Sequence, residues 1–319
     1  MRGMTGVGVC FGRPSEDGIS SLGSQPTSVP RGTAAPGTTV KLARQIANAT
    51  ASVLETSNAR DKALAGKTAF DFVKAADKLS LGAAAKLMSA RGADPARPPK
   101  PDLAPPREMK RRRLSSPAGR IALLHAVAHI EFNAINLAFD MATRFAREID
   151  DLGLDAAAFV SDWVRIGADE ARHYLLIDDL LAQRGAGYGD LPAHDGLWQA
   201  ARETSDFVDA RLAIAPMVLE ARGLDVTPGM ISNLSDVGDT AGADALGVIY
   251  REEIDHVLTG RHWFEMVCEA KRVDPVSHFR ALVASRFSGG LKPPFNHEAR
   301  ELAGFSAAYY SEEIGRADG

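Results

Sequence analysis

The stretch Glu170-Ala-Arg-His173 places a glutamate three residues before a histidine, and Glu253-Ile-Asp-His256 repeats this arrangement later in the chain. Both stretches lie in segments whose apolar residues recur with the spacing of an α-helix. Residues i and i+3 of a helix diverge by only about 60° around its axis, so each glutamate points to the same side as its histidine. A lone glutamate on a separate apolar segment precedes each copy, Glu131 before the first and Glu220 before the second.

All four glutamates share their helix faces with apolar side chains. The neighbours within two turns include Leu124 and Val127 for Glu131, Trp163 and Ile166 for Glu170, Met217 and Leu224 for Glu220, and Leu246 and Ile249 for Glu253. An ionised carboxylate buried without a partner is very costly, and too few cations share these faces to neutralise four acids. Two divalent metal ions would balance the charge. One Glu-x-x-His also occurs by chance on exposed helices, but two copies with core-facing glutamates favour a metal site.

The pattern therefore predicts a dinuclear metal site with six protein ligands: Glu131, Glu170, His173, Glu220, Glu253 and His256. Each Glu-x-x-His pair is expected to hold one metal ion, and the two lone glutamates to complete or bridge the pair. This is the ligand set of carboxylate-bridged metal centres in four-helix bundles. Imidazole with oxygen ligands suits iron or manganese better than a structural zinc. We expect two iron ions, with two manganese ions or a mixed manganese–iron pair as alternatives, and no catalytic residue beyond the ligands.

Three acids beside the predicted ligands are candidates for orienting the histidines, because a ligand histidine usually donates its other ring nitrogen to a carboxylate or carbonyl. Asp169 and Glu252 immediately precede the ligand glutamates of the repeated pattern, and Asp255 precedes His256. The alternative interpretation is that these acids are solvated residues on the flanks of their helices.

Two further features lie close to the predicted ligands in the sequence. His129 is a fourth candidate for a supporting role, although its direction on the helix, like that of His125, differs from that of Glu131 and favours structural histidines. Pro216 lies one turn before Glu220 and should free a backbone carbonyl and kink its helix. The kink could open space for oxygen or a substrate, or could only fit the helix to its neighbours.

Capping residues, glycines and prolines predict four long helices at 117–150, 155–185, 195–223 and 240–272. Shorter helices are expected within 39–91, after residue 275 and near 298–311. Ser116 before Pro117 is a typical helix start, and Pro228 with a short turn should separate the third long helix from the fourth. Strand-like alternation is absent. The predicted fold class is all-α, a four-helix bundle with additional N-terminal and C-terminal helices.

Composition divides the chain into four expected parts. Residues 1–38 are rich in Gly, Ser, Pro and Thr and are expected to form a disordered N-terminal extension. Residues 39–114 should be a helical segment that ends in a proline-rich strap around 93–106. Residues 115–285 should form the bundle, and 286–319 a helical C-terminal tail.

Charge and cysteine content limit the partners and the compartment. The net charge of −4 gives no electrostatic case for nucleic acid or an anionic membrane. The basic run 110–113 alone makes nucleic acid only a minor expectation. No apolar run reaches the roughly 18 residues of a membrane span, so no membrane is expected. Of the two cysteines, Cys10 lies in the predicted extension, so we expect no disulfide and a cytoplasmic protein.

The chain resembles the ferritin-like superfamily of di-metal carboxylate proteins and is similar, more narrowly, to a bacterial family known as domain of unknown function 455. The stretches that carry the resemblance are 95–101, 119–131, 169–173, 188–198, 220–225 and 253–256, within a match over roughly 40–285. The resemblance implies a ferritin-like fold with the same six ligands, and no established substrate. A related ferritin-like group hydroxylates a modified adenosine in tRNA, which is an analogy only.

The leading functional hypothesis is an oxygen-activating di-iron enzyme, an oxidase or monooxygenase that hydroxylates an unknown organic substrate. The substrate would be a small molecule or a modified nucleoside, and an electron donor is a further candidate partner. An iron-handling ferroxidase or storage protein is one alternative, although the residues around the bundle argue against a storage shell, and a monomer or homodimer is expected. A dimanganese centre that dismutates peroxide, like a catalase, is another alternative, and a non-catalytic scaffold the last.

Overall fold

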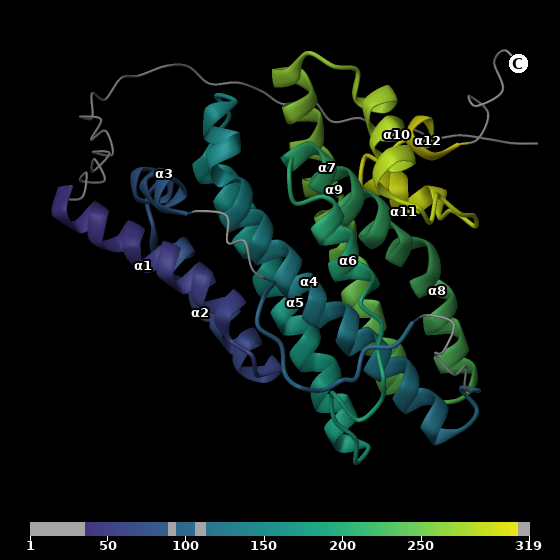
Figure 1. Cartoon of the computed structure of the whole chain (residues 1–319). Helices are drawn as coiled ribbons and strands as arrows, with labels where there is room; N and C mark the ends of the chain where they lie inside the picture. The colour runs from purple at the N-terminus through teal and green to yellow at the C-terminus, as the bar shows by residue number, and fades with distance from the viewer. Residues whose placement is uncertain (1–35, 89–93, 106–112, 312–319) are drawn as a thin grey trace, which may run out of the picture. The chain divides into compact units, whose positions relative to one another are not determined.

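The computed structural model describes residues 36–88, 94–105 and 113–311, and its regular structure over these residues is helical (Figure 1). The helices are α1 Pro36–Glu55, α2 Ala59–Ala75, α3 Lys78–Leu87, α4 Pro117–Asp151, α5 Ala156–Gln183, α6 Gly196–Glu203, α7 Val208–Ile214, the π-helix η2 Ala215–Glu220, α8 Ala221–Asp236, α9 Thr240–Lys271, α10 Pro275–Arg286, α11 His297–Leu302 and α12 Ala307–Tyr310. A single isolated bridge joins Leu103 to Ala193. The all-α prediction is confirmed.

The predicted starts of three long helices are confirmed by their caps. The side chain of Ser116 accepts a hydrogen bond from the Gly119 amide at the start of α4, which begins with Pro117. Asp155 caps α5 and Asp239 caps α9 in the same way. Each of these side chains satisfies an amide that the helix itself leaves without a partner. The helices that carry the two Glu-x-x-His stretches therefore begin where their sequence indicates.

The third predicted helix differs from the structure. Instead of one helix over 195–223, the chain forms α6, α7, η2 and α8, with residues 204–207 between the first two. The helix does not end at Gly223, and no turn forms at Pro228, which lies inside α8. The π-helix begins one residue before Pro216, whose missing amide cannot form the regular α-helical bond. The predicted disturbance at Pro216 is therefore a change of helix type.

The long helices pack in pairs. α4 packs mainly against α5, and α8 packs against α9, which also contacts α7, η2 and α5. Two glycines allow close approach. A Cβ on Gly167 of α5 would lie 2.5 Å from the Phe139 ring of α4, and one on Gly260 of α9 would lie 2.3 Å from the Pro216 ring. These contacts bring the segments that carry the glutamates close together.

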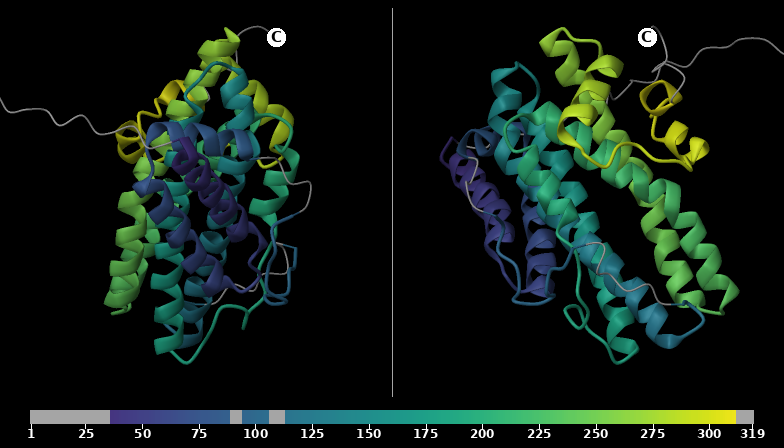
Figure 2. Two further views of the ribbon diagram at one scale, coloured as in Figure 1. Left: turned by 90° about the vertical axis from the view of Figure 1, so that its left-hand side faces the viewer. Right: turned by 45° about the vertical axis from the view of Figure 1, so that its right-hand side comes forward.

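Shorter helices cover the long ones on two sides (Figures 1 and 2). α1, α2 and α3, drawn in purple and blue, pack against α4 and α5. At the other side α10 contacts α7 and α9, and α11 contacts α8 and α9. The expected C-terminal helix near 298–311 is two short helices, because Gly304 between them has a left-handed φ of 66°.

The two non-helical expectations fall partly outside the described residues. Of the expected extension 1–38, residues 1–35 are not described, and 36–38 belong to α1. Residues 110–112 of the basic run are also not described. The described part of the proline-rich strap, 94–105, contains no helix, as predicted. Its Ala96 amide donates to the Leu54 carbonyl and its Ala104 amide to the Ala193 carbonyl, so the strap joins α1 to the segment before α6.

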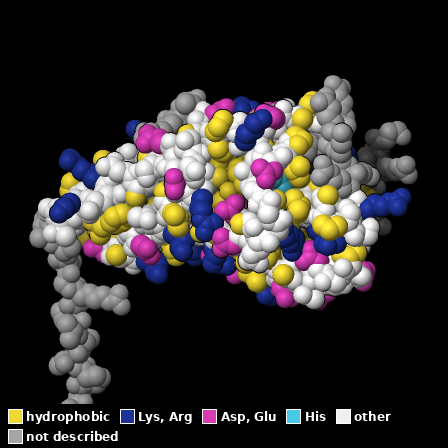
Figure 3. Space-filling model, turned by 90° about the horizontal axis from the view of Figure 1, so that it is seen from below, with side chains coloured by type: hydrophobic (Ala, Val, Ile, Leu, Met, Phe, Trp, Pro, Cys, Tyr) yellow, Lys and Arg dark blue, Asp and Glu magenta, His cyan; other side chains and the backbone are white. Residues whose placement is uncertain are grey.

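The longest helix, α4, and the surface of the protein are relevant to the prediction that no helix spans a membrane. α4 is long and apolar enough to cross a membrane by length and composition alone, but 72% of its most apolar window is buried within the protein. Core helices of soluble proteins have the same property. Seen from below, the described residues present acidic and basic side chains interspersed with apolar ones (Figure 3). One helix of this kind is weak support for a membrane span.

Candidate metal centre

The structure brings the six predicted ligands together from four segments. Glu131 lies in the middle of α4, Glu170 and His173 lie on α5, Glu220 is the last residue of η2, and Glu253 and His256 lie on α9. Glu131, Glu170 and both histidines are buried, with at most 3% of each residue exposed. Glu220 and Glu253 are half-buried as residues. Each nevertheless has one carboxylate oxygen that is fully shielded.

The ligand atoms converge on a small volume. Glu131, Glu170, His173 and Glu253 each offer one atom, and these four atoms lie within 4.8 Å of one another. His173 Nδ1 lies 3.3 Å from both Glu131 Oε2 and Glu170 Oε2. His256 Nδ1 lies 2.9 Å from Glu170 Oε1 and 3.6 Å from Glu253 Oε2. The two histidines therefore present the same ring nitrogen to the shared carboxylates.

Glu170 occupies the position between the two histidines. Its Oε2 faces His173 and its Oε1 faces His256. A carboxylate that offers one oxygen to each side is suited to bridge two metal ions. The sequence pattern had suggested the lone glutamates Glu131 and Glu220 for completing or bridging the pair, whereas the observed contacts point to a glutamate of the repeated motif for the bridge.

Glu220 lies at the edge of the cluster. It is not among the four residues whose atoms lie within 4.8 Å of one another, but it lines the same pocket as Glu131 and Glu253. Burial raises the pKa of Glu220 well above its usual value, and the nearby charges of Glu253 and Glu170 raise it further. A metal ion beside Glu131, Glu220 and Glu253 would favour the ionised form of Glu220, and so offset both its burial and the repulsion from the neighbouring carboxylates.

Each of the four glutamates has a buried oxygen without a hydrogen-bond partner. These atoms are Glu131 Oε2, Glu170 Oε1, Glu220 Oε2 and Glu253 Oε2, and both ring nitrogens of His256 share the property. The 2.9 Å approach of His256 Nδ1 to Glu170 Oε1 is close, yet it does not have hydrogen-bond geometry. Buried polar atoms almost always have partners. Unpartnered oxygens of Glu131, Glu170 and Glu253 close to the histidine Nδ1 atoms fit residues that could share a metal ion.

The charges of the cluster shift every pKa within it. Burial raises the pKa of Glu131 and of Glu253. Burial opposes the ionisation of Glu170 as well, but the adjacent histidines outweigh it and lower that pKa. Burial also disfavours the charged histidines, yet the carboxylates around them raise the pKa of His173 and of His256. The metal-free cluster therefore retains protons, which a metal would displace.

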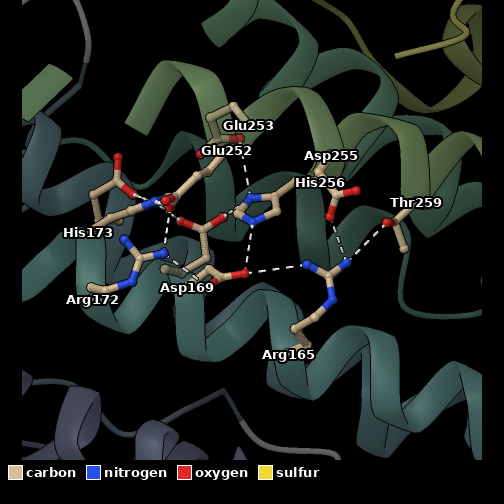
Figure 4. A network of polar contacts seen from close by, with 11 residues as sticks. Arg165, Asp169, Arg172, His173, Glu252, Glu253, Asp255, His256 and Thr259 are labelled. Atoms are coloured by element: carbon tan, nitrogen blue, oxygen red, sulfur yellow. Dashed lines mark hydrogen bonds and ion pairs between the residues drawn. The ribbon is translucent and has the colours of Figure 1, made fainter. Parts of the chain in front are cut away.

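Two acids outside the cluster face the outer nitrogens of the histidines (Figure 4). His173 Nε2 lies 2.6 Å from Glu252 Oε2, and His256 Nε2 lies 3.7 Å from Asp169 Oδ2. Each acid lies on the other helix from the histidine that it faces: Glu252 of α9 hydrogen-bonds with His173 of α5, whereas Asp169 of α5 lies near His256 of α9 without a hydrogen bond. Arg172 joins them, since its Nη2 lies 3.0 Å from Asp169 Oδ1 and 2.5 Å from Glu252 Oε2.

The other two candidates for supporting roles have different partners. Asp255 pairs with Arg165 at 2.8 Å rather than with a histidine. His129 Nδ1 lies 2.9 Å from the Tyr188 hydroxyl, and its Nε2 lies 3.0 Å from the His194 carbonyl oxygen. Burial lowers the pKa of His129 to about 4, so it is neutral. These contacts hold the loop before α6 against α4, which is a structural role.

Sequence reasoning missed two features of the site. Arg172 was not singled out, although its position between Glu170 and His173, three residues after Asp169, places it on the acidic flank of α5. The other is a pocket of about 220 Å³ whose wall includes Glu131, Glu220 and Glu253. The pocket arises where segments distant in sequence meet, so no local pattern could indicate it.

The fold and the site together define a class: an all-helical protein with a buried glutamate–histidine cluster that could hold metal. Its sequence matches the family described as "Protein of unknown function (DUF455)" over residues 45–311, and the chain belongs to that family. A relative from Haemophilus influenzae, described as an uncharacterized protein, is 39% identical over 209 residues, which cover 66% of this chain and 73% of the relative. No solved structure matches the chain.

Proposed function

We propose that this protein is a ferritin-like four-helix-bundle protein that binds two iron ions and activates dioxygen to oxidise an organic substrate. One observation carries the proposal: Glu131, Glu170 and Glu253 each have a buried, unpartnered oxygen close to Nδ1 of His173 or His256, and Glu220 has another at the edge of the cluster. Six such ligands, with a net charge of −4 on the ionised carboxylates, suit two divalent ions. Oxygen and imidazole donors without thiolates favour iron or manganese.

The six residues would divide the two ions between them. His173 with Glu131 would hold one ion, His256 with Glu253 the other, and Glu170 would lie between them. Glu220 would complete the set from the pocket side. A bound iron pair would supply the redox chemistry that lets dioxygen react with a C–H bond. Glu252 and Asp169 would keep the histidine rings oriented.

The overall reaction is a monooxygenation. A substrate C–H bond is broken and a C–OH bond forms with one oxygen atom of dioxygen, while the other atom leaves as water. Two electrons and two protons balance this reaction, and an external two-electron reductant must supply the electrons. The mostly apolar wall beside the glutamates offers water few hydrogen-bond partners at the place where the substrate would react.

Metal analysis tests the ligand assignment. The purified full chain, loaded anaerobically with Fe(II), should retain two iron ions per chain, and Glu170→Ala should retain fewer than one. Glu269→Ala is the matched control, because Glu269 is an exposed glutamate of α9 away from the cluster. An unchanged two-iron stoichiometry in Glu170→Ala would show that the ligand assignment is wrong.

Oxygen reactivity tests the chemistry. Mixing the Fe(II)-loaded chain with dissolved oxygen should give a transient visible absorption that Glu170→Ala lacks and Glu269→Ala keeps. Uptake of oxygen that yields only Fe(III) released from the protein, together with a large hollow oligomer on size-exclusion chromatography, would instead favour the ferroxidase or storage function. Oxygen release from peroxide by a manganese-loaded chain would favour the dismutase.

A further inference from the structure

A pocket of about 220 Å³ lies directly against the candidate metal centre. Residues of α4, η2, α8 and α9 enclose it, together with Leu197 of α6. Glu131, Glu220 and Glu253 form part of its wall, so a molecule inside it lies beside three of the six candidate ligands. The pocket is therefore placed to hold the substrate of the proposed reaction.

The rest of the wall is almost entirely apolar. It includes Val127 and Ile130 of α4, Leu219 of η2, Val226 of α8, and Leu246 and Ile249 of α9. Arg222, the one cation among the described residues of the wall, is already engaged, since its Nη1 donates to the carbonyl oxygens of Lys292 and Pro294 at 2.8 and 3.0 Å. Apart from the glutamates, the wall thus offers little to a charged or strongly polar group.

A glycine adds to the space in this pocket. Gly223 lies on α8 and forms part of the wall, and a Cβ built on it meets no atom within 4 Å. Close packing of the described protein therefore does not require glycine at this position. A larger side chain would extend into space that is open in the structure. A side chain at residue 223 would therefore not overlap its neighbours, and because this residue is part of the wall, we expect such a side chain to reduce the space in the pocket.

We propose that the pocket binds an uncharged hydrocarbon group of the substrate, an alkyl chain or a ring, with Gly223 limiting its size. This proposal rests on the proposed function and specifies its substrate class. At ~30 Å³ for each water-sized group, the pocket holds roughly seven non-hydrogen atoms. The C–H bond that reacts lies at the end of the group that reaches the glutamates, where the metal ions would be held.

Unbranched primary alcohols from methanol to decanol are suitable probes. Titration calorimetry on the full chain loaded with Mn(II) should show the affinity rising about fourfold for each added methylene, because each buried methylene contributes ~0.8 kcal/mol. The increase should stop at a chain of roughly seven non-hydrogen atoms, when the pocket is full. Affinity that does not depend on chain length would overturn the proposal.

Variants at matched glycines locate the binding site. Gly223→Leu should move the break in the series to shorter alcohols by about the four atoms that it adds. Gly229→Leu is the control, because Gly229 also lies in α8 with no atom within 4 Å of a built Cβ but is not part of the wall. Met230→Ala removes side-chain atoms from the wall and so enlarges the pocket, and should move the break in the affinity series to longer alcohols. Equal shifts in the two leucine variants would contradict the assignment.

Metal analysis of the same samples separates the two proposals. If the chain retains no metal but the alcohol series still breaks and responds to Gly223→Leu, the proposed function fails and the pocket assignment stands. If two metal ions bind but the series shows no break, the pocket assignment fails and the proposed function stands. Circular dichroism of each variant establishes that the helices remain intact.

Discussion

Glu220 illustrates how a buried carboxylate without a hydrogen-bond partner affects the stability of this protein. Glu220 is a buried carboxylate whose pKa is raised, first by burial and then by the charges of Glu253 and Glu170. Its Oε2 has no hydrogen-bond partner. Such a group lowers the stability of the metal-free fold, since an unpaired buried polar group costs ~1–3 kcal/mol. A residue that costs stability in this way is typical of a functional site.

Glu220→Gln should therefore stabilise the metal-free protein, and increasingly so as the pH rises. A carboxyl whose pKa is higher in the folded than in the unfolded state binds more protons when folded. It therefore lowers stability progressively as the pH rises above the unfolded value near 4.5. Glutamine removes this dependence.

Urea unfolding of the chelator-treated protein at pH 5 and pH 8 measures the effect. The variant should gain about 1–3 kcal/mol at pH 8 and less at pH 5. It should also lose most of the stabilisation that added metal gives the wild type. A variant that is less stable than the wild type at pH 8 would show that Glu220 has a partner in the metal-free protein.

The acids that face the outer histidine nitrogens permit a matched comparison. Glu252→Gln removes the carboxylate 2.6 Å from His173 Nε2 and should weaken metal binding about 10–100-fold. Asp255→Asn is the control, because Asp255 also lies beside the motif but pairs with Arg165. Competition with a coloured chelator measures both affinities. Equal losses in the two variants would mean that general surface charge, and not the histidine contact, is responsible.

At the scale of elements, the π-helix is the part that places Glu220. The turn over Ala215–Glu220 ends on this glutamate, and the Pro216 ring within it fits against Gly260 of α9. A Cβ at residue 260 would lie 2.3 Å from two atoms of that ring, closer than real contacts allow. The position of one candidate ligand thus depends on the close approach of a proline ring to a glycine.

Gly260→Ala should push η2 away from α9 and lower both stability and metal affinity. Overpacking of this kind typically costs about 1–3 kcal/mol. The double variant Gly260→Ala with Pro216→Gly removes both ring atoms that clash, the Cβ and the Cγ, and should recover part of both losses. Thermal unfolding with and without metal, over the full double-mutant cycle, measures the coupling. Additive effects of the two changes would show that the contact does not position η2.

The helix boundaries show which features of the fold can be predicted from sequence and which cannot. Ser116, Asp155 and Asp239 mark helix starts because capping is a local interaction between a side chain and an amide three residues later. The segment 195–236 could not be predicted as well. A helix end at Gly223 and a turn at Pro228 are expected from sequence, yet α8 continues through both residues, because packing against α9 outweighs the loss of one backbone bond.

The candidate site also has some features that follow from local sequence and others that depend on how the helices pack. The positions of His173 and His256 relative to their glutamates follow from helical periodicity, and the structure places all six candidate ligands in one region. The position of Glu170 between the two histidines could not be predicted, since it depends on how α5 and α9 approach each other. Glu252 and Asp169 each face a histidine of the other helix, which depends on the same approach of α5 and α9.

At the scale of the whole molecule, the C-terminal segment supports the wall of the pocket. Arg300 of α11 is buried, and its guanidinium lies 2.7 Å from Asp225 of α8. Its charge also lies over the rings of Phe295, Phe305 and Tyr310, with the closest centroid, that of Tyr310, at 4.5 Å. Asp225 belongs to the same helix as Gly223 and Val226 of the pocket wall. A residue far from the ligands in sequence thus holds the helix that bounds the pocket.

Removing one partner of this buried pair should destabilise the protein more than removing both. Arg300→Met leaves the buried Asp225 with the longer 3.4 Å contact of Arg222 as its remaining ion pair, and should cost up to about 3–5 kcal/mol, because most of the compensation of its charge is lost. Arg300→Met combined with Asp225→Leu removes both charges and should recover much of that loss. Urea unfolding measures the stability of each variant. Because α8 carries the pocket wall but only borders Glu220, alcohol affinity should fall in Arg300→Met while two metal ions are still retained. Loss of metal and alcohol binding together would show that the C-terminal segment supports the ligand cluster as well as the pocket.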